Sequence, residues 1–460
     1  MDGIEGLFRK LLVKKPLPVF IWITLLLFFG IYSYLSRNFL YFDTDIARDL
    51  YEVSNVWYNK VVWLGPRLSP GLHASPLYYY VLFPFVWLSG WNGFAIVLAT
   101  TGIAVFSLGL FGYFAYMQHR VKGFISMILI GGSSWFISLA IHPGNGYTYA
   151  LFLWISLTLL WYKKYFIVAA MFLGLAISYH PVAVFGIPFL LYEFWTRKRT
   201  LLYALLGSIV LVAPWTPIIL FEIITKGYMI RSWMESTSTG IAFQLSVSNV
   251  VLMGEIVHIH WIILLVLYTV TAHFAKGRLK NWYLMSLVPF LFLFVTARFQ
   301  FHYVFGFIIL YWFIVLQFLM HHRKDILLVT GLTVYLLFGT LRQFIYADPP
   351  TRTIQKIEYV TQSLIMQQEI PKNKKIAVVA ALDNDTRVPQ ADDYRFFLRM
   401  QGYTVLDPLQ YDQAEILLMF IEADHFEWEK WSSWEIDQAK GEKQLFHTEI
   451  NEVEVIGFSR

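Results

Sequence analysis

Long apolar segments recur along most of the chain and constrain its fold more than any other feature. A helix that crosses a bilayer needs about 20 predominantly apolar residues, and eleven segments of the sequence meet or approach that requirement. Charged residues make up only 15% of the chain, against about 25% in soluble domains. We therefore expect an α-helical polytopic membrane protein. The expected spans are 17–36, 93–117, 122–141, 146–162, 165–180, 181–195, 201–222, 257–274, 281–297, 303–320 and 325–346.

Basic residues gather in short clusters between these segments, in every second loop. Because cytoplasmic loops are enriched in Lys and Arg, this alternation predicts a multi-pass protein of the cell membrane with a cytoplasmic N-terminus and an extracytoplasmic C-terminus. The alternation holds only if the short apolar stretch 76–89, rich in Pro and Tyr, does not span and forms a helix at the outer interface. The clusters are Arg9, Lys10, Lys14 and Lys15; His119, Arg120 and Lys122; Lys163 and Lys164; Arg197, Lys198 and Arg199; Lys276, Arg278 and Lys280; and Arg323 and Lys324.

The composition changes after Tyr346, where Ala-Asp-Pro-Pro indicates a linker. We therefore expect a transmembrane domain over residues 1–346 and a small extracytoplasmic α/β domain over 347–460. Strands are expected at 375–380, 404–406, 414–420 and 453–458, and a helix at 392–400.

Two compositional absences narrow the function. The chain has no cysteine, which excludes disulfides, thiolate metal sites and thiol nucleophiles. No basic stripe interleaved with aromatic residues appears, so we expect no nucleic-acid partner.

The first outer loop, residues 37–92, carries the densest polar sequence near the expected membrane. We expect a helix over 50–57, and on a helix Asp45 and Asp49 would share a face beside Arg48. A carboxylate there could accept a proton from an attacking hydroxyl, and an arginine could bind a phosphate. The alternative is structural: Asp43 or Thr44 caps the helix, and Asp45 forms an exposed ion pair with Arg48.

Further polar groups stand at the outer ends of the expected spans, where ionisable residues often serve function. Packing at the membrane interface is the alternative explanation for each one. The substrate-binding candidates are Asp43, Arg48, Asp49, His73, Tyr79, His142, Asn145, His180, Lys226, Arg231, Arg298, His302 and Tyr303. Glu235, His258 and His260 lie on the same expected face.

We expect no cofactor. No HExxH or cysteine-containing motif indicates zinc. Asp43, Asp45 and Asp49 could instead hold a divalent cation through oxygen.

Three short segments, in order, resemble membrane glycosyltransferases of the protein O-mannosyltransferase and aminoarabinose transferase superfamily. They are Asp45-Ile-Ala-Arg-Asp49, His73-Ala-Ser-Pro-Leu-Tyr-Tyr79 and Arg298-Phe-Gln-Phe-His-Tyr303. The resemblance covers about residues 1–346. It implies a C-type glycosyltransferase fold, a polyprenyl-phosphate sugar donor, an active site facing away from the cytoplasm, and inversion with Asp45 as the base. Mannosyltransferases of the superfamily usually have Asp-Glu where this chain has Asp45-Ile46, so the acceptor class does not carry over and remains glycan, lipid or protein.

Combined with the residue pattern, the expected reaction has Asp45 take the acceptor proton while Arg298, with Lys226 or Arg231, holds the leaving phosphate. His73 and His142 are expected to orient sugar hydroxyls. A transporter or flippase for a lipid or polar solute is the alternative, although transporters usually place ionisable residues near the midplane. A third interpretation is a ligase that joins whole glycans.

Overall fold

A computed structural model of the protein divides into two compact units. It describes residues 18–58, 61–69, 72–162, 165–236, 247–295, 301–321, 350–368, 370–382, 391–423, 426–427, 430, 433, 436–437 and 443–459. Unit 1 comprises Met1–Ser36, Trp63–Tyr78 and Val97–Ala347. Unit 2 comprises Arg37–Val62, Tyr79–Ile96 and Asp348–Arg460. The expected span 325–346 lies outside the described residues.

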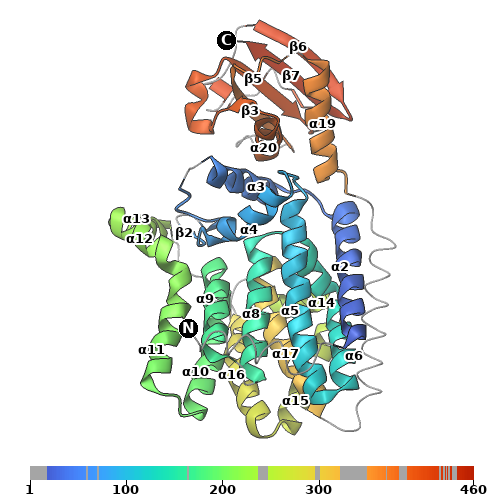
Figure 1. The fold of residues 1–460 in the computed structure, drawn as a ribbon, viewed down its shortest axis with the longest axis vertical. Helices are drawn as coiled ribbons and strands as arrows, with labels where there is room; N and C mark the ends of the chain where they lie inside the picture. Colours follow the sequence, from blue (N-terminus) through green and yellow to red (C-terminus); the bar gives the residue numbers. More distant parts are fainter. Residues whose placement is uncertain are drawn as a thin grey trace. The chain divides into compact units, whose positions relative to one another are not determined.

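Unit 1 consists mainly of apolar helices (Figure 1). Each expected span from 17 to 320 overlaps one of these helices or a consecutive pair of them, whereas the helices Tyr228–Ser236 and Ser248–Val257 were not expected. The helices are α2 (Val19–Phe39), α5 (Ala95–His119), α6 (Val121–Gly131), α7 (Ser134–Ile141), α8 (Asn145–Trp161), α9 (Phe166–Tyr179), α10 (Ile187–Thr196), α11 (Leu201–Val212), α12 (Thr216–Ile224), α13 (Tyr228–Ser236), α14 (Ser248–Val257), α15 (Trp261–Phe274), α16 (Gly277–Val295) and α17 (Phe305–His321).

The length and composition of these helices suit a membrane. Among the described residues, four helices are long and apolar enough to cross one, or six if each of two bent pairs is a single span. The four are Val19–Phe39, Ala95–His119, Leu201–Ile224 and Phe301–His321. Shorter apolar helices include Phe166–Tyr179 and Pro181–Thr196.

Two of the expected spans are not straight. The segment 122–141 is bent by 63° between α6 and α7, where the Ser133 hydroxyl donates to the carbonyl of Ile130 at 2.6 Å. The expected span 257–274 begins at Trp261 instead, after a 94° bend that follows α14. His258 ends α14 in the left-handed conformation, with φ of 53°. The first break lies at Gly-Gly-Ser-Ser (131–134) and the second at His-Ile-His (258–260), interruptions too short to end an expected span.

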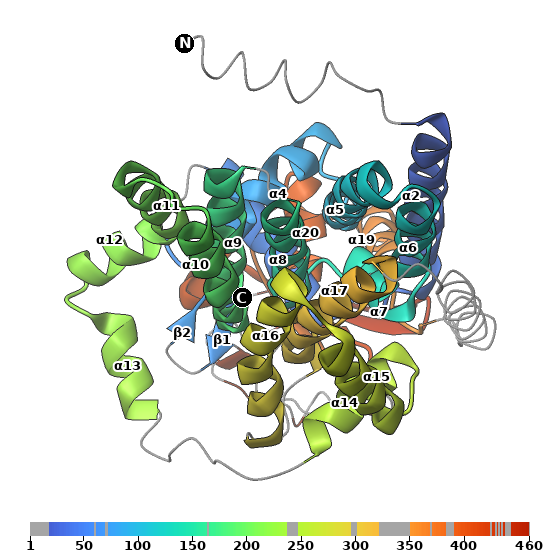
Figure 2. The same ribbon diagram turned by 90° about the horizontal axis from the view of Figure 1, so that it is seen from below.

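Helix α8 lies at the centre of unit 1. Almost every residue of this helix is buried, and Figure 2 shows it surrounded by neighbouring helices. It packs on α7, α9, α10 and α17. A helix that is apolar on all sides is stable only when enclosed in this way, so α8 fixes the positions of residues at both of its ends.

Unit 2 contains a five-stranded sheet of order β4-β3-β5-β7-β6. Strands β3 (Lys375–Ala381), β4 (Thr404–Val405) and β5 (Ile416–Ile421) are parallel, while β6 (Lys443–Ile450) and β7 (Val453–Ser459) add antiparallel pairs. Helix α20 (Asp392–Met400) follows β3, as the sequence predicts, whereas α19 (Ile354–Gln367) and β6 were not expected. The α/β character of this region is thereby confirmed.

The first-loop helix belongs to unit 2 and begins earlier than expected. Helix α3 spans Thr44–Trp57 rather than starting at Leu50, because the Asp43 carboxylate caps it by accepting from the N–H of Ile46 at 2.8 Å. The expected interfacial helix is α4 (Leu77–Leu88), of which the part from Tyr79 belongs to unit 2. Trp57 at the end of α3 packs on the rings of Phe83 and Trp87.

Helix α3 packs on α20 through a buried arginine. One Arg399 nitrogen donates to Ser54 Oγ at 3.0 Å and to Asn55 Oδ1 at 2.8 Å, both on α3. The guanidinium also bonds the hydroxyl of Tyr51 and lies 4.1 Å from that ring's centroid. Tyr51 in turn donates to Asp407 at 2.6 Å.

A second buried arginine holds the start of α3. The N–H of Phe42 donates to the carbonyl of Arg352 at 3.0 Å, and the Arg352 guanidinium donates back to the carbonyl of Phe42. The same guanidinium pairs with Asp393 and Glu422 from the C-terminal part of the chain. Because Phe42 directly precedes the cap residue Asp43, this contact sets where α3 begins.

Replacing Arg399 by alanine should destabilise unit 2 and loosen α3. The substitution leaves several buried polar groups unsatisfied, a loss of about 2–5 kcal/mol. Hydrogen exchange of the α3 amides should therefore accelerate and the unfolding temperature should fall. Lys374→Ala is the control, because its partner Glu415 lies in an exposed pair. Equal exchange in the two variants would contradict this role of Arg399.

Candidate active site

An acidic pair bridged by an arginine lies on the first turns of α3. Arg48 donates to Asp45 Oδ1 at 2.6 Å and to Asp49 Oδ1 at 2.8 Å. Asp49 is fully buried, whereas the side chain of Asp45 is 74% exposed. The two carboxylates therefore have different roles: Asp49 anchors the arginine from beneath, and Asp45 is presented to solvent.

The surroundings of Arg48 keep it charged. Burial disfavours the charged form, but the Asp49 carboxylate and the Tyr79 oxygen outweigh this and raise the pKa of Arg48 above its ordinary value. Burial also raises the pKa of Tyr79 well above its ordinary value, so its hydroxyl stays protonated and donates to Asp49 at 3.4 Å. The arrangement supplies a fixed cation beside an accessible carboxylate, whose Oδ2 has no hydrogen bond from any described residue.

In unit 1, three of the candidate histidines form one aromatic cluster around the start of α8. The ring centroid of His180 lies 5.8 Å from that of His302 and 4.4 Å from that of Tyr303. Tyr147 connects His142 to this cluster. The rings of His142 and Tyr147 stack with their centroids 4.9 Å apart, and the Tyr147 centroid lies 6.2 Å from that of His302. Residues from α7, α8, the end of α9 and the turn Phe301–Val304 are thus brought together.

The cluster continues toward a short hairpin of unit 1. Tyr303 donates to the carbonyl of Leu68 in β1 (Arg67–Ser69), which pairs with β2 (Leu72–His73). The His73 ring donates through Nδ1 to the carbonyl of Gly65 at 2.9 Å. Helix α13 packs on β2 and carries Arg231.

The candidate cations near α13 are exposed. Lys226 precedes the helix with a positive φ of 55°, and Arg231 donates to the carbonyl of Thr225 at 3.3 Å, which leaves most of its guanidinium available. Arg298, the expected phosphate clamp, lies outside the described residues.

Asp43 and Asn145 hold the first residues of two helices. Asp43 caps α3, as the alternative interpretation of the sequence proposed. Asn145 donates to the carbonyl of Tyr179 at 3.1 Å and thereby ties α8 to the end of α9. Both residues position their neighbours, whatever further contact they make with a substrate.

Sequence reasoning missed Tyr147 and Tyr149. The Tyr149 ring stacks on His180 at 4.7 Å, and its hydroxyl accepts from the N–H of Gly306 at 2.8 Å. The two tyrosines lie on α8 inside an apolar run, where nothing distinguishes them from packing residues.

The three aspartates of the first loop are engaged in contacts with the protein itself. No group of three or more His, Asp or Glu residues in the described part of the chain is placed to hold a metal ion. Asp43 is engaged as a cap, and the other two carboxylates bind Arg48.

The histidine cluster depends on a glycine. A Cβ at Gly146 would lie 2.7 Å from His302 Cδ2 and 3.3 Å from its Cβ, so Gly146→Ala should displace His302 and lower stability by about 1–3 kcal/mol. Gly102→Ala is the matched control, because nothing lies within 4 Å of a Cβ at that helical position. Thermal unfolding of the purified protein should show a lower midpoint for Gly146→Ala and an unchanged or higher one for Gly102→Ala. Equal midpoints would contradict the close approach.

Comparison with known proteins identifies the fold. Neither family models nor curated proteins match the sequence. Among solved structures, the chain is similar to ArnT from Cupriavidus metallidurans bound to undecaprenyl phosphate, with a TM-score of 0.61 and 11% identity over 95% of this chain and 97% of that chain. The apo structure of the same protein gives the same values. The likeness confirms the expected C-type glycosyltransferase fold, that of the aminoarabinose transferase ArnT.

Proposed function

We propose that this membrane protein transfers a sugar from a polyprenyl-phosphate donor to an acceptor hydroxyl on the non-cytoplasmic membrane face. The observation that carries the proposal is the exposed carboxylate of Asp45, held by a charged Arg48, on a fold similar to that of an enzyme solved with undecaprenyl phosphate. The sequence resemblance at Asp45–Asp49 supports the same assignment.

In the proposed reaction, Asp45 accepts the proton of the acceptor hydroxyl. The resulting oxygen nucleophile bonds to the anomeric carbon of the sugar on the face opposite the lipid phosphate. The bond between that carbon and the phosphate oxygen breaks, so the configuration inverts and polyprenyl phosphate leaves. Arg48 holds Asp45 Oδ1 and directs Oδ2 to solvent, which is the oxygen we assign to proton transfer.

The leaving phosphate needs positive charge rather than a proton. Lys226 and Arg231 are exposed cations, and the Arg231 side chain donates a single hydrogen bond to the described residues. Charge-assisted contacts to phosphate are strong. We also assign Arg298 to the phosphate, because it begins the segment Arg298–Tyr303 that resembles the superfamily. No metal or other cofactor is required in this scheme.

The histidine cluster is proposed to orient the sugar. His180, His302 and Tyr303 present ring nitrogens and a hydroxyl within one cluster. Such groups hydrogen-bond sugar hydroxyls, and their aromatic faces suit the apolar face of a sugar ring. His73 on β2 adds a further ring close to α13.

Asp45→Asn tests the base directly. The amide cannot accept the proton, so transfer of radiolabelled sugar from a polyprenyl-phosphate donor should fall by about 10²–10⁴-fold. Glu358→Gln on α19 is the matched control, because it makes the same chemical change at a half-buried site whose hydrogen bond, from Gln362, stays within its helix. Near-normal transfer by Asp45→Asn would show that Asp45 is not the base. If the unmodified protein transfers no sugar from the donor, the transporter alternative is favoured.

Arg231→Ala should raise the KM for the lipid-linked donor more than it lowers kcat. Loss of a charge-assisted contact to phosphate corresponds to roughly 10–100-fold in kcat/KM. Arg231→Lys keeps the charge and should recover part of the loss. If alanine and lysine behave alike and neither changes KM, Arg231 does not hold the phosphate.

A further inference from the structure

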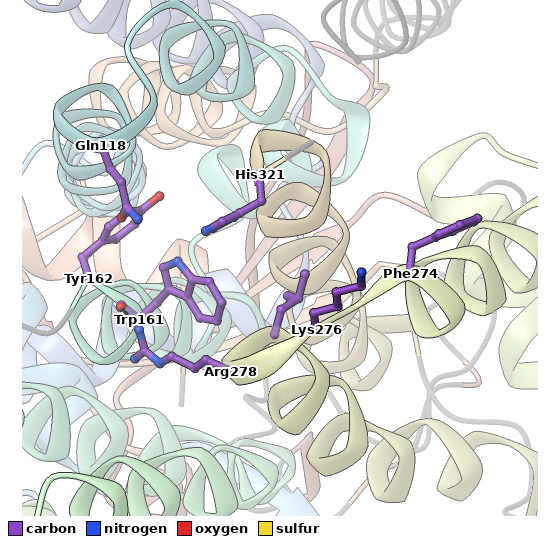
Figure 3. A pocket seen from close by; sticks show the side chains of 8 residues that line it. Gln118, Trp161, Tyr162, Phe274, Lys276, Arg278 and His321 are labelled. Carbon is purple, nitrogen blue, oxygen red and sulfur yellow. Dashed lines mark hydrogen bonds between the residues drawn. The ribbon is translucent and has the colours of Figure 1, made fainter. Parts of the chain in front are cut away.

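A cavity of about 620 Å³ opens at the opposite end of α8 from the histidine cluster. Helix α8 has 17 residues, so at 1.5 Å per residue its two ends are about 24 Å apart. The cavity lies at the C-terminal ends of α5, α8 and α17 and at the turn between α15 and α16. These are loops in which the sequence has its basic clusters. Its lining, drawn in Figure 3, is Gln118, Trp161, Tyr162, Phe274, Lys276, Arg278, Leu279 and His321.

The lining of this cavity is cationic. It contains Lys276, Arg278 and His321 and no acidic residue among the described ones. Lys276 is exposed and donates no hydrogen bond to a described residue. His321 engages the carbonyl of Gln317 through Nδ1 at 2.6 Å, so its Nε2 is available to a ligand.

Arg278 is fixed as one wall of the cavity. Its guanidinium donates to the carbonyls of Trp161 and Leu160 and pairs with buried Glu193. It also lies 4.6 Å from the centroid of the Trp161 ring. Glu193 also pairs with Arg197, so it balances the charge of Arg278 only in part, and Lys276 supplies a further cation that a ligand would meet.

An apolar stripe leads to the cavity along α15. Ile262, Val266, Val270 and Phe274 recur every four residues and are 48%, 56%, 39% and 51% exposed. Residues four apart share one helix face, so the stripe is continuous and ends at Phe274, which lines the cavity. A ligand that fits both features has an anionic head and long apolar chains.

We propose that this cavity binds the phosphate headgroup of an anionic phospholipid, whose acyl chains lie along the α15 stripe. Basic pockets between membrane helices recognise lipid headgroups in this way. A free phosphate ion would leave the stripe uncovered. The residues proposed to hold the donor's phosphate, Lys226 and Arg231, do not line this cavity, so the two sites are distinct, and this inference does not depend on the transferase assignment.

Native mass spectrometry of the full-length protein in mild detergent tests the proposal. The protein is titrated separately with phosphatidylglycerol, phosphatidylcholine, undecaprenyl phosphate and inorganic phosphate. The variants are Lys276→Glu and Lys280→Glu, the second being an exposed lysine on the same helix end that does not line the cavity. Thermal unfolding verifies that each variant is folded, and Lys276→Gln replaces Lys276→Glu if charge reversal prevents folding.

We expect one phosphatidylglycerol to remain bound and to resist inorganic phosphate. Reversing the charge of Lys276 should weaken its retention roughly 30-fold, whereas Lys280→Glu should change it by less than about threefold. The proposal is overturned if phosphatidylcholine is retained equally, if undecaprenyl phosphate displaces phosphatidylglycerol at equal concentration, or if inorganic phosphate does so. Equal losses in the two lysine variants would also overturn it, because they would reflect surface charge rather than a site.

Discussion

The guanidinium of Arg399 is a buried charge, and helix α3 satisfies most of its hydrogen bonds. Moving a charge out of water is costly unless it is paired and fully bonded, and here Ser54, Asn55 and Tyr51 supply that compensation. The C-terminal sheet and α3 therefore form one folded body, although about 340 residues separate their sequences. Arg352 adds a second contact at the residue before the helix cap.

This construction gives the acidic site a rigid base. The face of α3 that packs inward carries Leu50, Tyr51 and Ser54, and the first turn leaves Asp45 exposed. A base must stay within hydrogen-bond reach of the proton it removes, and a helix fixed at its cap and along its buried face meets that requirement better than a loop. The C-terminal part of the chain thus has a positioning role for α3, whether or not it also contacts an acceptor.

Much of the fold could be predicted because burial in a membrane leaves a simple sequence signal. Apolar runs located most helices of unit 1, and the predominantly apolar segments 375–380 and 414–420 located the central strands β3 and β5. The bends after Gly131 and at His258 escaped prediction, because only three or four small or polar residues interrupt the apolar sequence at each bend. The early start of α3 agrees with the alternative in which Asp43 is the cap, whereas the expected start at Leu50 was too late; the contact between Phe42 and Arg352 beside the cap is tertiary and has no local signal.

The candidate site could be predicted only in part, because contacts between residues distant in sequence arrange it. His142, His180, His302 and Tyr303 were selected one by one from span ends, and the structure places them in one cluster. The difference between buried Asp49 and exposed Asp45 follows from helix packing, which spacing alone does not determine. Arg399 and Tyr149 act through partners distant in sequence and carry no local signature.

The most direct test of the account is the side of the membrane on which the acidic site and the C-terminal unit lie. The chain has no cysteine, so single substitutions Asp45→Cys, Leu409→Cys and Lys280→Cys each introduce one reactive thiol, and Leu409 is 85% exposed. A membrane-impermeant maleimide applied to intact cells should label positions 45 and 409, and position 280 only after lysis. Labelling of 45 and 409 from opposite sides, or of 280 together with 45, would contradict a catalytic carboxylate on the non-cytoplasmic face.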